Sequence, residues 1–516
     1  MQQQASPSPP PTRLRRHAAR GTRPGSTTTT KKPFPLQLQS LPPVLRPLVR
    51  AYILGFASSV LPRLLTVILQ HLSRARAKNE NCLPAEKDHR SFVDSVLHVL
   101  RIGLEPQRFP TFCAVLVGGA TVLQEPLKRI VARCAAGLGE TARLRTARWL
   151  ASFFAAWLSL KLLQSKQQAP RKNSSAPFRP PKPTDDDAVA PHQGKLAGRT
   201  LDLTLFAATQ AVDVIVGELW SRHRARRTAA RTWTKAEQFL SQMIDPLSFV
   251  ASCGLIMWAW FYAPDSLPRG YNKWITSAAH VDLRLIEALR RFKTKELRYR
   301  EETGQTSLLG SMCEHYGLPY EWGDPTKFVP FPCDIVHMGR GPSCEYHAWR
   351  RFWLSWRWSM YTYLPLALAL QLRKPTRSSP WLALKSACRS SAFLATYITL
   401  FYYGVCLGRT RVGPRLVGTD TACRNRIDGG ICVGVGCFLC GWSVLIETAS
   451  RRKDMALFVA PRAMATLLPR RYPLERQWRE TLAFAVSTAV VFTCAAENPK
   501  RVRGMMGGIL GLTLGQ

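Results

Sequence analysis

The sequence predicts an all-α, polytopic membrane protein made of two duplicated helical units of about four spans each. Three observations carry this prediction. The 18 residues between Asp428 and Glu447 contain no charge, which is about the length at which an apolar run can cross a bilayer. Tryptophan gathers in or beside such runs and Lys or Arg lies just outside them, as bilayer interfaces favour. The spacing RxxDxxLFxAxxA occurs twice, starting at Arg199 and at Arg451.

The chain is strongly basic, with 72 Lys and Arg against 33 Asp and Glu in 516 residues. Such a charge would suit a nucleic-acid partner. However, the basic residues lie between apolar runs instead of gathering in a patch, and no zinc-finger, RNP or helix-turn-helix pattern occurs. We therefore expect the lipid bilayer as the partner and no nucleic acid.

Two segments have compositions that cannot bury a core. Residues 1–43 are rich in Pro, Ser, Thr and Arg, and no acidic residue precedes Glu80, so we expect a disordered basic tail. The same composition resembles a mitochondrial transit peptide, although prolines interrupt any amphipathic helix there. Residues 164–198 contain six prolines and are predicted to be a disordered linker.

The remaining chain is organised around ten apolar segments. They are 44–72, 109–123, 149–163, 201–220, 246–263, 352–372, 392–408, 429–446, 455–468 and 481–496. They form a first unit at 44–278 and a second at 346–516. Because several segments are short and the first is broken by Arg50 and Pro62, four true spans per unit are favoured, which would give the two copies the same membrane orientation.

Small residues mark a helix-packing face on the segment 429–446. Gly430, Gly434, Cys437 and Gly441 follow at steps of four, three and four. On a helix these positions share one face and allow close approach of a second helix, within the chain, in a homo-oligomer or from another membrane protein. Glycines 504, 508 and 511 provide a second such face. Glu447 is expected to pair with Arg451.

The insert at 279–345 separates the two units. Between His280 and Glu302, Val281, Leu285, Leu289 and Phe292 share one helical face and basic residues occupy the others. This helix would either lie on an anionic membrane surface or cover the bundle. The rest of the insert is Pro-rich and predicted to be irregular.

Three shifts relate the two units. A shift of 252 residues aligns both RxxDxxLFxAxxA segments, a shift of 235 places Phe249 on Phe484, and a shift of 285 places Trp157 on Trp442. The equivalent acids Asp202 and Asp454 begin apolar segments, and each is expected to pair with the Arg three residues earlier, which are Arg199 and Arg451.

A family resemblance rests on five stretches. They are CDIVHMGRGPSC at 333–344, CRSSAFL at 388–394, CGWSVLIETASRRKDMALFVAPRA at 440–463, PRRYP at 469–473 and NPKRVRG at 498–504. They resemble the fungal branch of the transmembrane protein 135 family, itself similar to the superfamily of channel-type mitochondrial import translocase subunits and a small peroxisomal membrane protein. Met338 departs from that family, which tends to have Pro after the His. The resemblance implies a membrane protein of mitochondria or peroxisomes associated with organelle dynamics and lipid handling.

One polar constellation could carry chemistry. Cys333, His337, Cys344 and His347 are spaced CxxxHx6CxxH, and two Cys with two His can close a tetrahedral zinc site. The spacing differs from the common zinc finger, so a redox-sensitive Cys pair and unliganded packing stand beside the metal, and packing is favoured. We therefore assign no metal, no cofactor and no catalytic residue.

No nucleophile–base pair, P-loop, GxGxxG or HExxH occurs, so we expect no enzyme. A non-enzymatic scaffold or channel-like membrane protein is the leading hypothesis. The alternative is a transporter with a site between the duplicated halves, in which an intramembrane acid such as Asp213 would bind substrate. Basic loops throughout the chain leave its membrane orientation open.

Overall fold

The computed structural model describes residues 41–79, 92–135, 137–165, 196–371 and 379–514. The chain divides into two units, residues 1–42 and 43–516, and every helix described here belongs to the second. The expected basic tail at 1–43 lies outside the described residues up to residue 40, and so does most of the predicted linker 164–198.

The described chain is all-α apart from one pair of two-residue strands. The first half comprises α1 (Arg46–Asn79), α2 (Phe92–Leu104), α3 (Phe109–Val122), α4 (Gln124–Cys134), α5 (Glu140–Gln164), β1 (Leu196–Ala197), α6 (Leu201–Ala229), α7 (Lys235–Tyr262), η1 (Pro264–Ser266) and α8 (Arg269–Ala279). The cap comprises α9 (Leu283–Thr294), α10 (Thr306–His315), η2 (Tyr320–Gly323) and α11 (Cys333–Val336).

The second half contains two long helices interrupted by π-helical turns. It comprises α12 (Cys344–Gln371), α13 (Ser379–Leu407), η3 (Gly408–Val412), α14 (Gly413–Val417), α15 (Thr421–Arg426), η4 (Ile427–Ile431), α16 (Cys432–Cys440), η5 (Gly441–Ile446), α17 (Ala449–Thr466), β2 (Tyr472–Pro473), η6 (Leu474–Arg476), α18 (Gln477–Glu497), η7 (Pro499–Arg501) and α19 (Gly504–Leu514).

Six helices in the described residues are long and apolar enough to cross a membrane. They are Arg46–Leu72, Leu201–Ala229, Lys235–Tyr262, Pro380–Val417, Thr421–Ile446 and Leu474–Glu497. They correspond to six of the ten predicted segments, fewer than about four spans in each unit would require. The other four fall short because α3 has only 14 residues, while charged and polar residues leave α5, α12 and α17 without a sufficiently apolar stretch of 18 residues.

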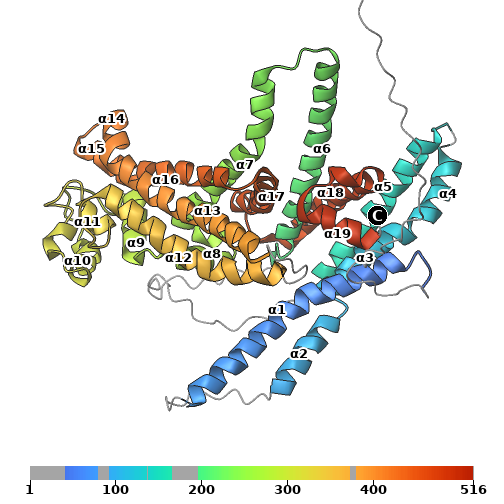
Figure 1. Cartoon of the computed structure of the whole chain (residues 1–516), viewed down its shortest axis with the longest axis horizontal. Helices are drawn as coiled ribbons and strands as arrows, with labels where there is room; N and C mark the ends of the chain where they lie inside the picture. The colour runs from blue at the N-terminus through green and yellow to red at the C-terminus, as the bar shows by residue number, and fades with distance from the viewer. Residues whose placement is uncertain (1–40, 80–91, 136, 166–195, 372–378, 515–516) are drawn as a thin grey trace, which may run out of the picture. The chain divides into compact units, whose positions relative to one another are not determined.

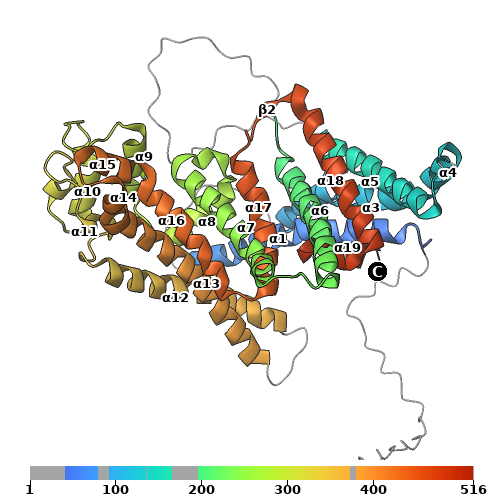
Figure 2. The same cartoon turned by 90° about the horizontal axis from the view of Figure 1, so that it is seen from above.

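The helices of the two halves are interleaved. Neighbouring helices pack in the series α1, α3, α5, α18, α6, α17, α7, α16, α13 and α12. In Figure 1 and Figure 2 the green α6 and α7 of the first half accordingly lie beside the red α17 and α18 of the second. The strands β1 and β2 also join the halves, with Leu196 opposite Pro473 and Ala197 opposite Tyr472.

The buried apolar side chains follow the same interleaving. One core draws on α1, α3, α5 and α6 together with α18 and includes Phe112, Leu160 and Phe484. The other draws on α7, α8 and α9 together with α13, α16 and α17 and includes Ile256 and Phe401. Neither core is built from one half alone, so each half needs the other to bury its apolar faces.

The helix expected at 280–302 covers the bundle. It forms α9, which starts with the side chain of Asp282 accepting a hydrogen bond from the Arg284 backbone N–H. Leu285, Leu289 and Phe292 on its apolar face are buried within the protein. The structure thereby decides between the two expectations for this helix, and its apolar face is not available to a membrane surface.

The glycine face expected on 429–446 is not one continuous helical face. Gly430 adopts a φ of 154° in the π-helical turn η4, and α16 ends at Cys440. A Cβ at Gly434 would lie 4.0 Å from Trp258, whereas one at Gly436 would lie 2.8 Å from the carbonyl oxygen of Phe401. Within α16 the close helix approach therefore involves Gly436, which the predicted face did not include. Gly441, which it did include, also marks a close approach, because a Cβ there would lie 2.6 Å from the Cα of Val250 on α7.

The predicted ion pairs have mixed outcomes. Glu447 pairs with Arg451 at 3.5 Å, although Glu447 precedes the first turn of α17 instead of lying within one helix with Arg451. The pairing of Asp202 with Arg199 is wrong. Asp202 is instead 3.4 Å from Arg470, which lies beyond the end of α17, and Arg199 is exposed.

Candidate metal centre and apolar cavity

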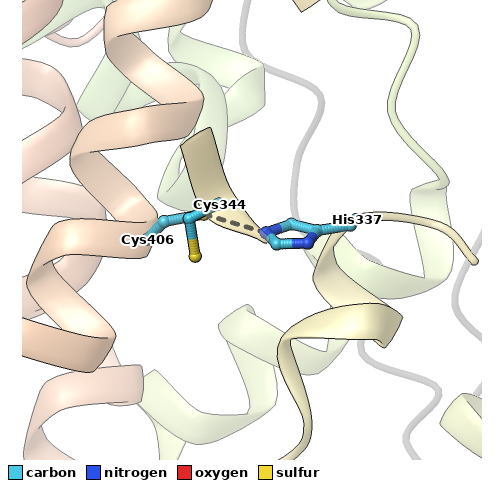
Figure 3. Close-up of side chains that lie close together, drawn as sticks. All are labelled: His337, Cys344 and Cys406. Carbon is cyan, nitrogen blue, oxygen red and sulfur yellow. Dashed lines mark hydrogen bonds between the residues drawn. The ribbon is translucent and has the colours of Figure 1, made fainter. Parts of the chain in front are cut away.

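Three of the four predicted Cys and His residues meet, together with one cysteine from a distant helix. Cys333 begins α11, His337 follows its last turn, and Cys344 begins α12. Cys406 on α13 points to the same place (Figure 3). The ligand atoms of His337, Cys344 and Cys406 all lie within 4.8 Å of one another.

The imidazole of His337 is fixed in one orientation. Its Nδ1 lies 2.7 Å from the carbonyl oxygen of Gly341, and its Nε2 lies 3.4 Å from the sulfur of Cys406. Because a carbonyl oxygen can only accept, Nδ1 carries the proton and Nε2 presents its lone pair to the sulfur atoms. The ring is fully buried, and burial holds the pKa of His337 below its ordinary value, which favours this neutral form.

Cys333 lies next to this group. Its thiol interacts with that of Cys344, and Cys333, Cys344 and Cys406 are all free of disulfides. Burial raises the pKa of Cys333 to about 11, with the Arg409 guanidinium opposing that shift. In the absence of a metal the Cys333 thiol therefore stays protonated and unreactive at neutral pH.

His347, expected as the fourth member, has a different role. Its ring stacks on that of His337, with centroids 4.5 Å apart and planes 13° from parallel. Both ring nitrogens are buried without a hydrogen-bond partner, and burial lowers the pKa of His347 to about 3. The neutral ring therefore packs against His337, while Cys406 takes the place that the CxxxHx6CxxH spacing gave to His347.

A second feature is an apolar cavity of about 280 Å³ between the halves. Helices α7, α8, α9, α13 and α17 supply its walls. Representative lining residues are Ile256, Phe261, Leu289, Ile398, Phe401 and Val405. Of the described residues that line it, Arg409 and Asp428 are the charged ones.

Arg409 and Asp428 form a buried ion pair beside this cavity. The two guanidinium–carboxylate distances are 2.7 and 3.0 Å, and the Tyr299 hydroxyl donates to the same carboxylate. Arg409 also donates to the carbonyl oxygen of Phe331 at 3.3 Å, whereas its Nη1 is buried without a partner. The ion pair therefore links the cap to the helices that contain η3 and η4. The Nη1 group of Arg409 remains a donor without an acceptor.

The π-helical turns explain how charged residues reach this place. Arg409 lies in η3 and Asp428 in η4, each inserted between two stretches of α-helix. Such turns are frequent at functional sites because they change the direction of side chains along a helix. The apolar pattern of the sequence does not single out this pair, whose signal is one charge at the end of each of two apolar segments. Asp213, the acid predicted to bind substrate in a transporter, lies on α6 and does not line the cavity.

The helices, the cavity and the Cys and His cluster define an all-α chain with six candidate membrane spans among the described residues. The chain matches no protein-family model, no curated protein and no solved structure.

Met338 stands where the transmembrane protein 135 family, which the sequence resembles, tends to have proline. It adopts a φ of 57°. A proline ring excludes that value, so the loop after His337 differs from one carrying proline there.

Proposed function

We propose that the chain is a non-enzymatic integral membrane protein that holds the acyl part of a lipid in the cavity between its two halves. The observation that carries this proposal is the cavity of about 280 Å³ with its apolar walls and one buried ion pair. The resemblance to the transmembrane protein 135 family supports mitochondria or peroxisomes as the location and lipid handling as the role.

The chemistry of the walls favours an amphipathic ligand. Each methylene removed from water contributes about 0.8 kcal/mol, and the volume is near the lower end of the ~300–1,000 Å³ typical of small-molecule pockets. Arg409 is 5% exposed and its Nη1 has no partner. A carboxylate or phosphate oxygen at the cavity end would satisfy that donor, so the ligand has an apolar chain and an acidic head.

We also propose that the two halves are duplicated copies that exchange helices. The packing series is symmetric under an exchange of the two halves. If α1 is exchanged with α12, α3 with α13, α5 with α16, α6 with α17 and α7 with α18, the series becomes its own reverse. The sequence shifts of 285, 252 and 235 residues match these same three pairs of segments. Agreement between these two independent patterns supports the proposed duplication.

Transport is the second candidate function. Duplicated halves that enclose a site are common in transporters, and the cavity lies between elements of both halves. The acid expected to bind substrate, Asp213, does not line it. Ligand retention without flux is therefore the favoured form of the proposal, and uptake of a fluorescent fatty acid into proteoliposomes distinguishes the two.

Photo-crosslinking tests the binding proposal. The purified full chain in mild detergent is incubated with a diazirine-bearing fatty acid, illuminated and mapped by mass spectrometry. We expect labelled peptides from α8, α9 and α13, and a loss of at least fivefold in labelling for Val405→Phe, which fills the cavity. Leu384→Phe is the matched control, because Leu384 lies exposed on the same helix, α13.

Equal labelling of both variants, or labels confined to residues exposed on the outer helix faces, would show that the probe binds the outside of the bundle only. Gel filtration and thermal unfolding of both variants in detergent establish that each is folded. A folded Val405→Phe variant with unchanged labelling at α8 and α9 contradicts the proposal.

A further inference from the structure

We infer that Cys333, His337, Cys344 and Cys406 bind one zinc ion in a closed, tetrahedral Cys₃His site that fastens the cap to α13. The inference is independent of the lipid proposal, since it rests on a different cluster of side chains. It adds a metal site to a chain for which the sequence favoured none.

The distances suit a single metal ion. Zinc bonds of about 2.3 Å to sulfur and about 2.0 Å to nitrogen, at tetrahedral angles, place the ligand atoms roughly 3.5–3.8 Å apart. The His337 Nε2 is 3.4 Å from the Cys406 sulfur, and the Cys344 sulfur lies within 4.8 Å of both. Cys333 is the fourth ligand: its thiol interacts with that of Cys344 but is not among the three ligand atoms that lie within 4.8 Å of one another, so its side chain has to rotate to complete the set.

The surroundings match those of metal-bound histidine. A histidine that ligates zinc through one ring nitrogen usually donates its other N–H to a carbonyl or carboxylate. His337 does so through Nδ1 to the Gly341 carbonyl oxygen at 2.7 Å, and the stacked ring of His347 holds its plane. The loop between His337 and Cys344 thus positions a ligand in advance of the metal.

The charge balance can be written out. Binding one Zn²⁺ releases one proton from each of three thiols, so the loaded site has three thiolates, one neutral imidazole and a net charge of −1. Arg409, one turn after Cys406 on the same continuous helix, contributes positive charge near Cys333. Four protein ligands leave no open coordination position, so the site is structural and not catalytic.

The consequence concerns the cap. Cys333 and His337 flank α11, whose Ile335 and Val336 line the apolar cavity, and Cys406 lies on α13, which forms another wall. A zinc ion would fix these elements to each other within a few ångströms. Metal loss is therefore expected to loosen one end of the cavity without changing the helices of the bundle.

The test measures metal on the full-length chain purified in detergent without chelator. We expect about one zinc per chain by inductively coupled plasma mass spectrometry, and less than a fifth of that for Cys406→Ser or Cys344→Ser. Cys313→Ser is the matched control, because Cys313 is also buried in the cap but lies outside the cluster. Its zinc content should equal that of the unaltered chain.

A second measurement does not depend on the fold of a variant. The unaltered chain is reduced, stripped of metal and titrated with Co²⁺. Intense absorption bands between about 600 and 750 nm, with thiolate charge transfer near 300–350 nm, saturating at one equivalent and lost on adding Zn²⁺, are expected of tetrahedral coordination by three sulfurs and one nitrogen.

Several outcomes would overturn the inference. They include a zinc content unchanged in Cys406→Ser, a Cys333–Cys344 disulfide in the native chain with no Co²⁺ binding after its reduction, and iron with visible absorption in place of zinc. Binding of Co²⁺ without the thiolate charge-transfer band would equally contradict the cysteine ligands.

Discussion

At the scale of the residue, the buried ion pair of Arg409 and Asp428 allows a sharp prediction. Replacing Asp428 by Asn leaves a buried guanidinium without its counter-charge, so we expect a loss of about 3–5 kcal/mol. The double substitution Arg409→Met with Asp428→Leu removes both charges and should cost much less. Thermal unfolding in detergent compares the two variants with the unaltered chain.

Equal destabilisation by the single and the double substitution would mean that packing, not an unpaired charge, governs this site. Tyr299 provides a check, because its hydroxyl donates to Asp428 and loses that acceptor in the double variant, whereas Asn in the single variant keeps an amide oxygen. Tyr299→Phe alone should cost about 1 kcal/mol, the usual net contribution of one hydrogen bond.

A second prediction concerns the glycines of α16. Gly436→Ala should destabilise the chain, because its Cβ would lie 2.8 Å from the Phe401 carbonyl oxygen and the backbone of α13 would have to move. Gly434→Ala should be neutral or stabilise the chain by up to about 1 kcal/mol, since its nearest neighbour is 4.0 Å away and alanine is the better helix former. Thermal unfolding of the two variants, side by side, measures the difference. A lower melting temperature for Gly434→Ala than for Gly436→Ala would contradict it.

Much of the Cys and His cluster could be predicted at this scale, and part could not. Local spacing placed Cys333, His337 and Cys344 together because they lie within twelve residues of one another. Spacing could not select Cys406 over His347, because a cysteine in an apolar segment is indistinguishable from a small core residue until the helices are packed. The same limit applied to Gly436, whose importance comes from the backbone that faces it.

At the scale of the element, α9 begins with a cap that makes its stability depend on pH. Burial would raise the pKa of Asp282, but the Arg284 side chain and backbone N–H outweigh that effect and hold the pKa below its ordinary 3.8. A depressed pKa in the folded state contributes stability above the unfolded pKa, and that contribution is lost as the pH falls through the folded value. Asp282→Ala should therefore cost about 1 kcal/mol at pH 7.

The measurement is the stability difference between the unaltered chain and Asp282→Asn between pH 7 and pH 3. It should shrink as the pH falls, because protonation removes the charge that the substitution lacks. A difference that stays constant with pH would show that the ion pair with Arg284 at 2.8 Å contributes nothing to the cap.

The sequence predicted most elements, but fewer of the described helices than expected have the length and apolarity of a membrane span. All ten apolar segments are helical, yet α3, α5, α12 and α17 do not reach the length and apolarity of a span. The reason is that apolar periodicity also marks helices buried among other helices, as α5 is with eight buried positions. The sequence did not predict the π-helical turns η3 and η4, although glycines, which are poor helix formers, lie in or beside both, at Gly408 and Gly413 and at Gly429 and Gly430.

At the scale of the whole molecule, the interleaving of the halves has a direct consequence for expression in pieces. In the first half α5 and α6 pack against α18, and in the second half α16 and α17 pack against α7. If the chain is cut in the exposed loop between Glu302 and Thr303, each piece leaves apolar faces uncovered. Either piece alone should aggregate or be degraded, whereas co-expressed pieces should purify together.

The proposed duplication makes a further prediction about α6 and α17, the two helices that carry the RxxDxxLFxAxxA spacing. In an exchanged arrangement these helices contact each other, and the Thr209 hydroxyl lies 3.8 Å from the sulfur of Met464. Thr209→Cys with Met464→Cys in one chain should therefore crosslink within the chain through a short bifunctional maleimide, visible as faster migration on a denaturing gel. The matched control pairs Thr209→Cys with Leu468→Cys, which lies beyond the end of α17 and should crosslink far less.

Two independent, unexchanged bundles would keep α6 away from α17, because each helix would then bury its Leu-Phe and Ala positions within its own half. An absent crosslink in the first pair, or an equal one in both, would therefore argue against exchanged copies, even if the sequence shifts still mark an ancient duplication.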